Sequence, residues 1–266
     1  MSDLLRVERD GPFARVTLTR PEVRNAFNAA LIGELRSTFE SLAGEPPEAL
    51  RGVVLAGEGT VFCAGADVEW MRASIGLSVE DNERDAAAMA DMYVAIDTCP
   101  VPVIARVQGA ALGGGMGLCA VADVVLATAD ATFGFTETKL GIIPAVISPF
   151  VLAKIGESAA RALFPTGERF GAERARQIGL VHEVLPDEAA LDARLAALVG
   201  ELRSAGPTAL RSAKALIRDQ RGLAPDGARA LTVRAIARQR ASHEGQLGLA
   251  AFLEKRRPDW RDADGG

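Results

Sequence analysis

Cysteine and histidine are scarce in this chain of 266 residues, which has three cysteines and two histidines. Cys63, Cys99 and Cys119 are widely spaced and form no C-x-x-C pair, which argues against a disulfide framework or a zinc ribbon and favours a reducing compartment. Neither His182 nor His243 has a metal-binding partner three or four residues away. His182 is interpreted as part of a strand face and His243 as a residue at a helix start, so we expect no metal site.

The common catalytic motifs are also missing. The chain has no G-x-S-x-G, no H-E-x-x-H and no G-x-x-x-x-G-K-[ST] sequence. Serine triads, zinc proteases and P-loop enzymes are therefore not expected. Positive charge is not in excess either, because 30 lysines and arginines face 35 acidic residues and give a formal net charge of −5. This balance argues against nucleic acid as a partner.

Long hydrophobic runs are absent as well. The longest uncharged stretch, residues 107–122, contains five glycines and is shorter than the ~18 to 20 apolar residues that a membrane helix requires. The first ten residues are charged from Asp3 onward and lack the apolar centre of a secretory signal. We therefore expect no membrane partner and a cytoplasmic location.

What the sequence does contain is an alternation of strand and helix patterns. A hairpin is predicted where two alternating runs flank the turn Asp10-Gly11, and Asn28 and Ser78 each precede an apolar helical pattern. Further strands are predicted over residues 52–56, 101–107, 123–128, 131–135 and near 180–184. Further helices are predicted over residues 187–204, 207–218, 225–241 and 244–254. Such alternation is typical of an α/β protein with a parallel or mixed sheet and helices packed outside it.

Three loops rich in small residues follow predicted strands, at residues 62–67, 112–117 and 133–141. Small residues allow a ligand to approach main-chain N–H groups, and N–H groups at a helix start stabilise a developing oxyanion. Two of these loops can form one oxyanion hole. The alternative is that the glycines serve only tight turns and close packing.

Part of the glycine-rich loop matches a dinucleotide-binding fingerprint, but its surroundings do not fit one. Residues 115–120 match G-x-G-x-x-A, and Glu137 lies 20 positions after Gly117. However, the preceding strand is predicted to end near Val107 and the next to begin by Asp123, which leaves no room for a crossover helix. Glu137 is instead the main acid–base candidate, because apolar surroundings raise the pKa of a carboxyl group. A solvated turn glutamate is the alternative.

Four segments, in this order and spacing, resemble the enoyl-CoA hydratase/isomerase (crotonase) family. They are F-C-A-G-A-D at 62–67, G-A-A-L-G-G-G at 109–115, F-G-F-T-E-T-K-L-G-I-I-P at 133–144 and F-L-E-K-R at 252–256. The resemblance implies a crotonase fold, with a spiral core of repeated strand-strand-helix turns over residues 1–200 and a helical oligomerisation region over residues 201–266. It also implies a homotrimer or a dimer of trimers. The implied substrate is an acyl-CoA thioester, with coenzyme A as part of the substrate and no separate cofactor.

The resemblance also assigns roles to individual residues. Ala66 and Gly114 match the family's two oxyanion-hole residues, and Glu137 matches one of its two catalytic glutamates. Gly117 stands at the position of the other glutamate, which is the main departure from the family. Glu69 stands where many members have a lysine, so Arg24 is the candidate for that positive charge. The resemblance implies that the substrate contacts Arg24, Ala64, Asp67, Trp70, Met71, Gly117, Phe252 and Lys255.

A narrower likeness concerns the substrate. A-D-V-E-W-M at 66–71, G-I-I-P-A-V-I-S-P-F at 141–150 and E-K-R-R-P-D-W at 254–260 resemble bacterial methylglutaconyl-CoA hydratases of leucine breakdown, some with the same glycine. This favours a lyase that hydrates a 2-enoyl-CoA, including branched or carboxylated ones. The missing glutamate keeps two alternatives open. One is a Δ3,Δ2-enoyl-CoA isomerase, which can work with one carboxyl group, and the other is a non-catalytic acyl-CoA-binding protein.

Overall fold

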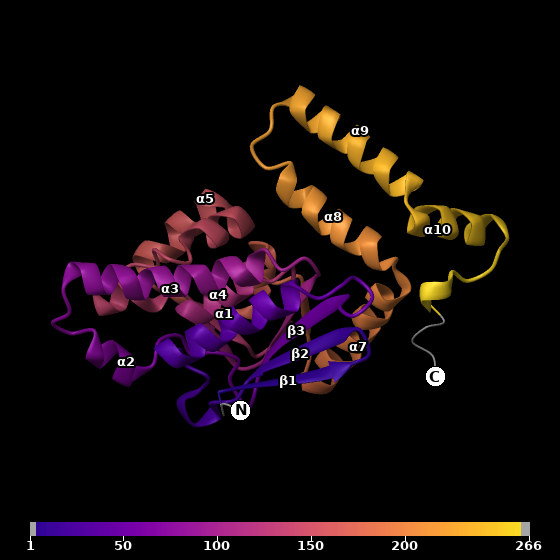
Figure 1. Cartoon of the computed structure of the whole chain (residues 1–266). Coiled ribbons are helices and arrows are strands. Elements are labelled where there is room, and N and C mark those ends of the chain that lie inside the picture. Colours follow the sequence, from indigo (N-terminus) through magenta and orange to yellow (C-terminus); the bar gives the residue numbers. More distant parts are fainter. Residues whose placement is uncertain (1–3, 262–266) are drawn as a thin grey trace.

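A computed structural model describes residues 4–261 (Figure 1). Its larger sheet has six strands in the order β1-β2-β3-β4-β6-β9, parallel except for the β1–β2 hairpin. These strands are β1 (Leu5–Asp10), β2 (Phe13–Leu18), β3 (Gly52–Gly57), β4 (Val103–Val107), β6 (Val124–Thr128) and β9 (Glu183–Leu185). A smaller sheet has the order β5-β7-β8. Its strands are β5 (Ala110–Leu112), β7 (Thr132–Gly134) and β8 (Arg169–Gly171).

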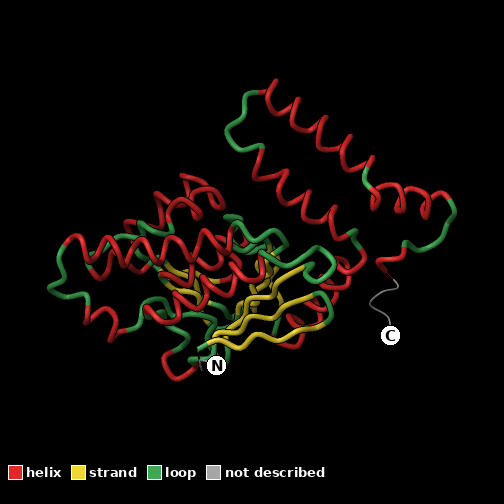
Figure 2. Tube along the Cα trace, viewed as in Figure 1, coloured by secondary structure: helices red, strands yellow, loops and turns green. Residues whose placement is uncertain are grey.

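Helices cover these sheets, and Figure 2 shows them around the strands. In the first part of the chain they are α1 (Ala29–Ala43), α2 (Val68–Ala73), α3 (Val79–Asp97), α4 (Gly114–Val121), α5 (Ser148–Thr166), α6 (Ala172–Gln177) and α7 (Glu188–Ser204). The last part contains α8 (Pro207–Asp219), α9 (Pro225–Ala241) and α10 (His243–Leu253). Short 3-10 turns are η1 (Pro21–Val23), η2 (Thr136–Leu140) and η3 (Asp259–Arg261).

Local signals explain where the first helices begin. The Asn28 side chain accepts a hydrogen bond from the Leu31 N–H over 2.8 Å, and the Ser78 hydroxyl accepts one from the Asp81 N–H over 3.1 Å. Each bond satisfies a helix-start N–H that lacks an intrahelical partner. The sequence predicted both caps, and the β1–β2 hairpin and helices α7 to α10 also occur close to their predicted bounds.

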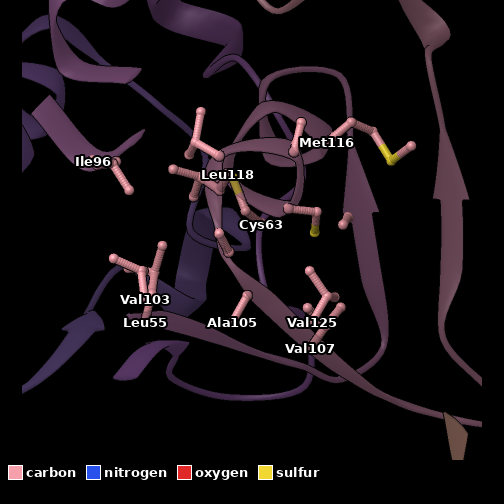
Figure 3. Packing of buried hydrophobic residues seen from close by; sticks show 14 of the residues in the cluster. Leu55, Cys63, Ile96, Val103, Ala105, Val107, Met116, Leu118 and Val125 are labelled. Atoms are coloured by element: carbon pink, nitrogen blue, oxygen red, sulfur yellow. The ribbon is translucent and has the colours of Figure 1, made fainter. Parts of the chain in front are cut away.

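The core lies between the larger sheet and helices α3 and α4. Figure 3 shows side chains of β3, β4 and β6 meeting those of Ile96, Met116 and Leu118. Helix α4 is buried along residues 115–121, so its position is set by packing on all sides. At its C-terminal end the Lys154 ammonium group donates hydrogen bonds to the carbonyl oxygens of Cys119 and Ala122. This buried helix therefore gives its N-terminus a fixed place in the fold.

The last three helices project from the core, drawn in orange to yellow in Figure 1. Helix α9 contains no buried residue, and several apolar side chains of this region are exposed. They include Ile217, Leu223, Val233, Ile236, Leu249, Phe252 and Leu253. None of the described helices combines the length and the apolar character needed to cross a membrane.

Two sequence predictions need correction. The strand before the glycine-rich loop ends at Val107 as predicted, but a further strand that was not predicted, β5 (Ala110–Leu112), lies between it and α4. A strand of three residues carries too few side chains to show an alternating pattern. The late strand was expected near 180–184 and is instead β9 at Glu183–Leu185, while His182 lies just before it and accepts a hydrogen bond from the Val125 N–H.

Candidate active site

A cavity of about 330 Å³ lies between α2, α3, the start of α4 and the segment from η2 to residue 147. It brings together segments from the three small-residue loops that the sequence singled out. Six of the predicted site residues line it: Ala64, Ala66, Trp70, Met71, Gly114 and Glu137. The cavity is therefore the candidate active site.

The first oxyanion-hole candidate is the Ala66 N–H. Ala66 forms an isolated parallel bridge with Phe27. In this bridge the Phe27 N–H donates to the Gly65 carbonyl over 2.7 Å, and the Asp67 N–H donates to the Phe27 carbonyl over 2.8 Å. The Gly65 carbonyl and the Asp67 N–H are thus paired, whereas the Ala66 N–H has no acceptor among residues 4–261.

The second candidate is the Gly114 N–H at the start of α4, where N–H groups have no intrahelical acceptor. The preceding Gly113 N–H donates to the Gly134 carbonyl over 3.0 Å, but that of Gly114 has no acceptor in the described part of the chain. The two loops touch at Gly65, whose φ is +95°. A Cβ at Gly65 would lie 2.9 Å from the Leu112 carbonyl oxygen and 3.5 Å from the Gly114 nitrogen. Glycine therefore permits the approach that brings both donors to one cavity.

Glu137 lies in η2, on the wall of the same cavity. Its Oε1 is 3.6 Å from the position that a Cβ on Gly113 would take, so the carboxyl group lies beside the second donor loop. Its Oε2 is buried and has no hydrogen-bond partner. Burial raises the pKa of Glu137 above its ordinary value, because the charged form loses solvation. Glu137 is thus a partly buried acid rather than a solvated turn residue.

Gly117 is not among the residues that line the cavity, so the structure gives its predicted substrate contact no support. The space in which a side chain at this position would start is filled. A Cβ on Gly117 would lie 2.5 Å from Ile147 Cγ2 and 2.6 Å from Tyr93 Cζ. The position of the second family glutamate is therefore occupied by two other side chains.

Asp67 supports the site without lining the cavity. It caps α2 by accepting from the Glu69 N–H over 2.8 Å and forms a largely buried ion pair with Arg20 over 2.7 Å. Burial alone would raise its pKa, but the hydrogen bonds from Arg20 and the Glu69 N–H hold the pKa of Asp67 below its ordinary value. Arg20 also donates to the Ala26 carbonyl over 2.6 Å, so the pair ties the Ala66 loop to the segment before α1.

Three predicted substrate contacts lie away from the cavity in this chain. Arg24 is exposed, has a φ of +55° and meets the site only through its carbonyl oxygen, which accepts from the Ala64 N–H over 3.0 Å. Phe252 lies at the end of α10 and is 80% exposed, and Lys255 follows just after this helix. The single chain does not bring these residues to Glu137.

Sequence reasoning missed several residues of the site. Tyr93 belongs to the apolar helical pattern after Ser78 and was not singled out, although a buried phenol needs a hydrogen-bond partner and that requirement was a usable signal. Asp85 and Asn82, one helical turn apart on α3, line the cavity, but no motif marks them. In the part of the chain described, no three histidine, cysteine or acidic side chains come together as a metal site.

The site combines two free backbone N–H donors with a partly buried carboxyl group. This combination is suited to an enzyme that polarises a substrate carbonyl and moves a proton on a neighbouring carbon. The chain belongs to the enoyl-CoA hydratase/isomerase family, whose sequence model matches residues 8–263. It is 32% identical to 2,3-dehydroadipyl-CoA hydratase from Escherichia coli K12, over 98% of this chain and 99% of that protein.

Solved structures agree with this assignment. An enoyl-CoA hydratase from Shewanella pealeana is similar with a TM-score of 0.91 and 37% identity, covering 97% of this chain and 96% of that one. Pseudomonas aeruginosa AtuE is similar with a TM-score of 0.93 and 36% identity, covering 97% of this chain and 99% of that one. The α/β crotonase fold predicted from the sequence is confirmed.

Proposed function

We propose that this protein adds water to the double bond of 2-enoyl-CoA thioesters whose acyl chain is uncharged. The observation that carries the proposal is the Glu137 carboxyl group, with Oε2 buried and unpartnered, in the same cavity as the free N–H groups of Ala66 and Gly114. Coenzyme A belongs to the substrate in this proposal, and no separate cofactor takes part.

The two N–H groups act on the thioester carbonyl. As water attacks Cβ, negative charge moves onto the carbonyl oxygen, and donors from Ala66 and Gly114 stabilise it. Because both belong to the backbone of packed segments, they need little reorganisation during the reaction. One such donor is worth roughly 3 to 4 kcal/mol in the transition state.

Glu137 carries both proton transfers. In its neutral form, which the raised pKa favours, one carboxyl oxygen gives its proton to Cα while the other accepts a proton from the attacking water. The water oxygen bonds to Cβ, and the carboxyl group is neutral again at the end. Because a single group serves both carbons, the hydrogen and the hydroxyl arrive on the same face of the double bond. This cycle needs no carboxyl group at position 117.

The residues that line the cavity set the substrate class. Its walls are mainly apolar, with Met71, Met89 and Ile143 among them, and the charged residues of the described lining are Asp85 and Glu137. A carboxylate at the end of the acyl chain would therefore meet negative rather than positive charge. We accordingly favour straight or branched uncharged chains over carboxylated ones such as methylglutaconyl-CoA.

Parallel assays test this function. We expect loss of the double-bond absorbance with crotonyl-CoA and 3-methylcrotonyl-CoA, and a kcat/KM at least about tenfold lower with 3-methylglutaconyl-CoA, which corresponds to one unfavourable charge contact. Asp85→Asn should narrow this gap, whereas Glu83→Gln, which removes a charge from the same helix outside the cavity lining, should not. Preference of the wild-type enzyme for the carboxylated substrate would contradict the proposed specificity.

Isomerisation is the second candidate, because one carboxyl group can move a proton between Cα and Cγ. A 3-enoyl-CoA substrate in deuterated water separates the two reactions. Hydration of a 2-enoyl-CoA places solvent deuterium at Cα and consumes the double bond, whereas isomerisation of the 3-enoyl-CoA forms a conjugated double bond. Turnover of only the 3-enoyl substrate would contradict the proposed hydratase activity and favour an isomerase. Binding of thioesters without any turnover would leave a non-catalytic acyl-CoA-binding protein.

We also propose that the protein forms a homotrimer or a dimer of trimers through α8 to α10. The support is the exposed apolar surface of this region, which includes Val233, Ile236 and Phe252. Assembly would also allow Phe252 and Lys255 to reach a coenzyme A bound by a neighbouring copy. Light scattering tests the assembly, and a stable monomer at micromolar concentration would contradict it.

A further inference from the structure

We propose that Tyr93 is a positioning residue of the oxyanion hole, whose hydroxyl group holds the Gly114 end of α4 in place for the thioester carbonyl. The inference rests on the function proposed above. Tyr93 lies on α3, its side chain is fully buried, and it is the one tyrosine of the chain. It does not line the cavity, so it acts through Gly114.

A hydrogen bond connects the two residues. The Tyr93 hydroxyl donates to the Gly114 carbonyl oxygen over 2.7 Å. Gly114 is also the residue whose free N–H begins α4 and lines the cavity. The carbonyl and the N–H belong to peptide groups on either side of one Cα atom. A bond that fixes the carbonyl from the core side therefore restrains the direction of the N–H.

Packing restrains Gly114 further. A Cβ on Gly114 would lie 2.7 Å from Phe27 Cε2 and 3.2 Å from Tyr93 Oη, so the residue sits in a space closed by both side chains. The two rings meet edge to face, with centroids 6.4 Å apart and an interplanar angle of 82°. The Phe27 backbone in turn pairs on either side of Ala66. Tyr93 thus belongs to a packed unit that contains both donor residues.

Tyr93 also remains a donor throughout the working pH range. Burial raises the pKa of its phenol well above the ordinary value, and the nearby Cys63, Glu137 and Cys119 add to the shift. The phenol therefore neither gives up its proton nor takes one during turnover. The hydroxyl of Tyr93 therefore acts by positioning Gly114. Its loss should reduce the polarisation of a bound thioester carbonyl.

Tyr93→Phe removes the hydroxyl and keeps the ring. The first readout is the absorption of bound cinnamoyl-CoA, which moves to longer wavelength when its carbonyl is polarised. We expect a smaller wavelength shift in Tyr93→Phe than in the wild type. We also expect kcat to fall about tenfold, as for the loss of one hydrogen bond, with KM changed less than about twofold. The control is Thr98→Val, which removes a hydroxyl at the C-terminal cap of the same helix that donates to the Val94 carbonyl over 2.7 Å.

The outcomes separate this inference from the proposed function. An unchanged wavelength shift and kcat in Tyr93→Phe would overturn the role of Tyr93 while leaving the hydratase proposal intact. Absence of any shift in the wild type would instead remove the thioester site on which the inference rests.

A second measurement covers the case in which Tyr93→Phe does not fold. Because the chain has one tyrosine, growth on 3-fluorotyrosine labels position 93 alone. We expect its fluorine resonance to move when acetoacetyl-CoA binds and to move less with free coenzyme A. Equal responses to both, or no response to either, would overturn the proposal.

Discussion

The ring of Phe27 lies against Gly114, while the backbone of Phe27 pairs on either side of Ala66. One residue therefore contacts both segments that supply the free N–H groups, although 48 positions separate Ala66 from Gly114 (114 − 66). The relative position of the two donors is set by side-chain packing as well as by the sheet. This makes the site sensitive to small changes of volume at Gly114.

Gly114→Ala should reduce both activity and stability. Its Cβ would come within 2.7 Å of the Phe27 ring, and an extra methyl group in a packed core costs roughly 1 to 3 kcal/mol. A shift of the donor should also lower kcat. Urea unfolding and kcat measure the two effects. The control is Gly33→Ala in α1, where nothing lies within 4 Å of the added Cβ, and helix propensity should stabilise it by ~0.5 to 1 kcal/mol. Equal stability of the two variants would contradict the packing.

Glu137→Gln should remove most of the catalysis and leave binding intact. The amide keeps the shape of the side chain but cannot transfer a proton, so we expect kcat to fall by roughly 10² to 10⁴. Calorimetric titration with acetoacetyl-CoA should still show binding. In the wild type, kcat/KM should fall as the pH rises through the raised pKa of Glu137, because the neutral acid is lost. A rate that increased over this window would contradict its role as the proton donor.

The same residue predicts a pH dependence of stability. The pKa of Glu137 is higher in the folded chain than in the unfolded chain, because burial disfavours the charged carboxylate. Its stabilising effect is therefore present at low pH and is lost as the pH rises from the ordinary carboxyl pKa through the raised one. Thermal unfolding of Glu137→Gln and wild type should diverge across this window, with the variant gaining relative to the wild type. A constant difference in Tm at all pH values would contradict the shift.

All three cysteines should resist thiol reagents in the folded protein. Cys63, Cys99 and Cys119 are buried, and burial raises the pKa of Cys63 and of Cys119 to about 12. The reactive thiolate is therefore absent near neutral pH. We expect no reaction with Ellman's reagent before unfolding and reaction of all three thiols in denaturant. Fast labelling of the native protein would contradict the burial of these thiols.

Lys154 should titrate near pH 8. Burial lowers its pKa to about 8, and its amine donates to the carbonyl oxygens of Cys119 and Ala122. The pKa is lower in the folded chain than in the unfolded one, so stability should rise as the pH increases from about 8 toward the ordinary lysine value. Methylation with ¹³C-formaldehyde followed by NMR gives the midpoint, and Lys154→Met identifies the resonance by its absence. A midpoint at the ordinary lysine pKa would contradict burial.

Local chemistry made much of the fold predictable. Asn28 and Ser78 predict the starts of their helices because a cap acts within three residues. The Asp10-Gly11 turn likewise predicts the hairpin. Strand β5 escaped prediction because three residues show no period. The residues of the candidate cavity were found through motifs, since Ala66, Gly114 and Glu137 lie in the loops that resemble the family's.

The support around the site was not predictable in the same way. Arg20 and Asp67 are 47 positions apart and meet only once the chain is folded. In the sequence, Tyr93 occupies one more apolar position of an amphipathic helix. No sequence feature indicates that its ring packs against Gly117. Contacts of this kind depend on how α3 packs against α4, which no local pattern encodes.

The contact between Tyr93, Ile147 and Gly117 limits how this enzyme can change under selection. Any side chain at position 117 starts within 2.7 Å of both neighbours, so a second carboxyl group there requires Tyr93 and Ile147 to move. A library randomised at position 117 alone should return glycine among its active members. A library randomised jointly at positions 93, 117 and 147 should also return active variants with other residues at position 117. A change at position 117 is thus coupled to the side chains at positions 93 and 147.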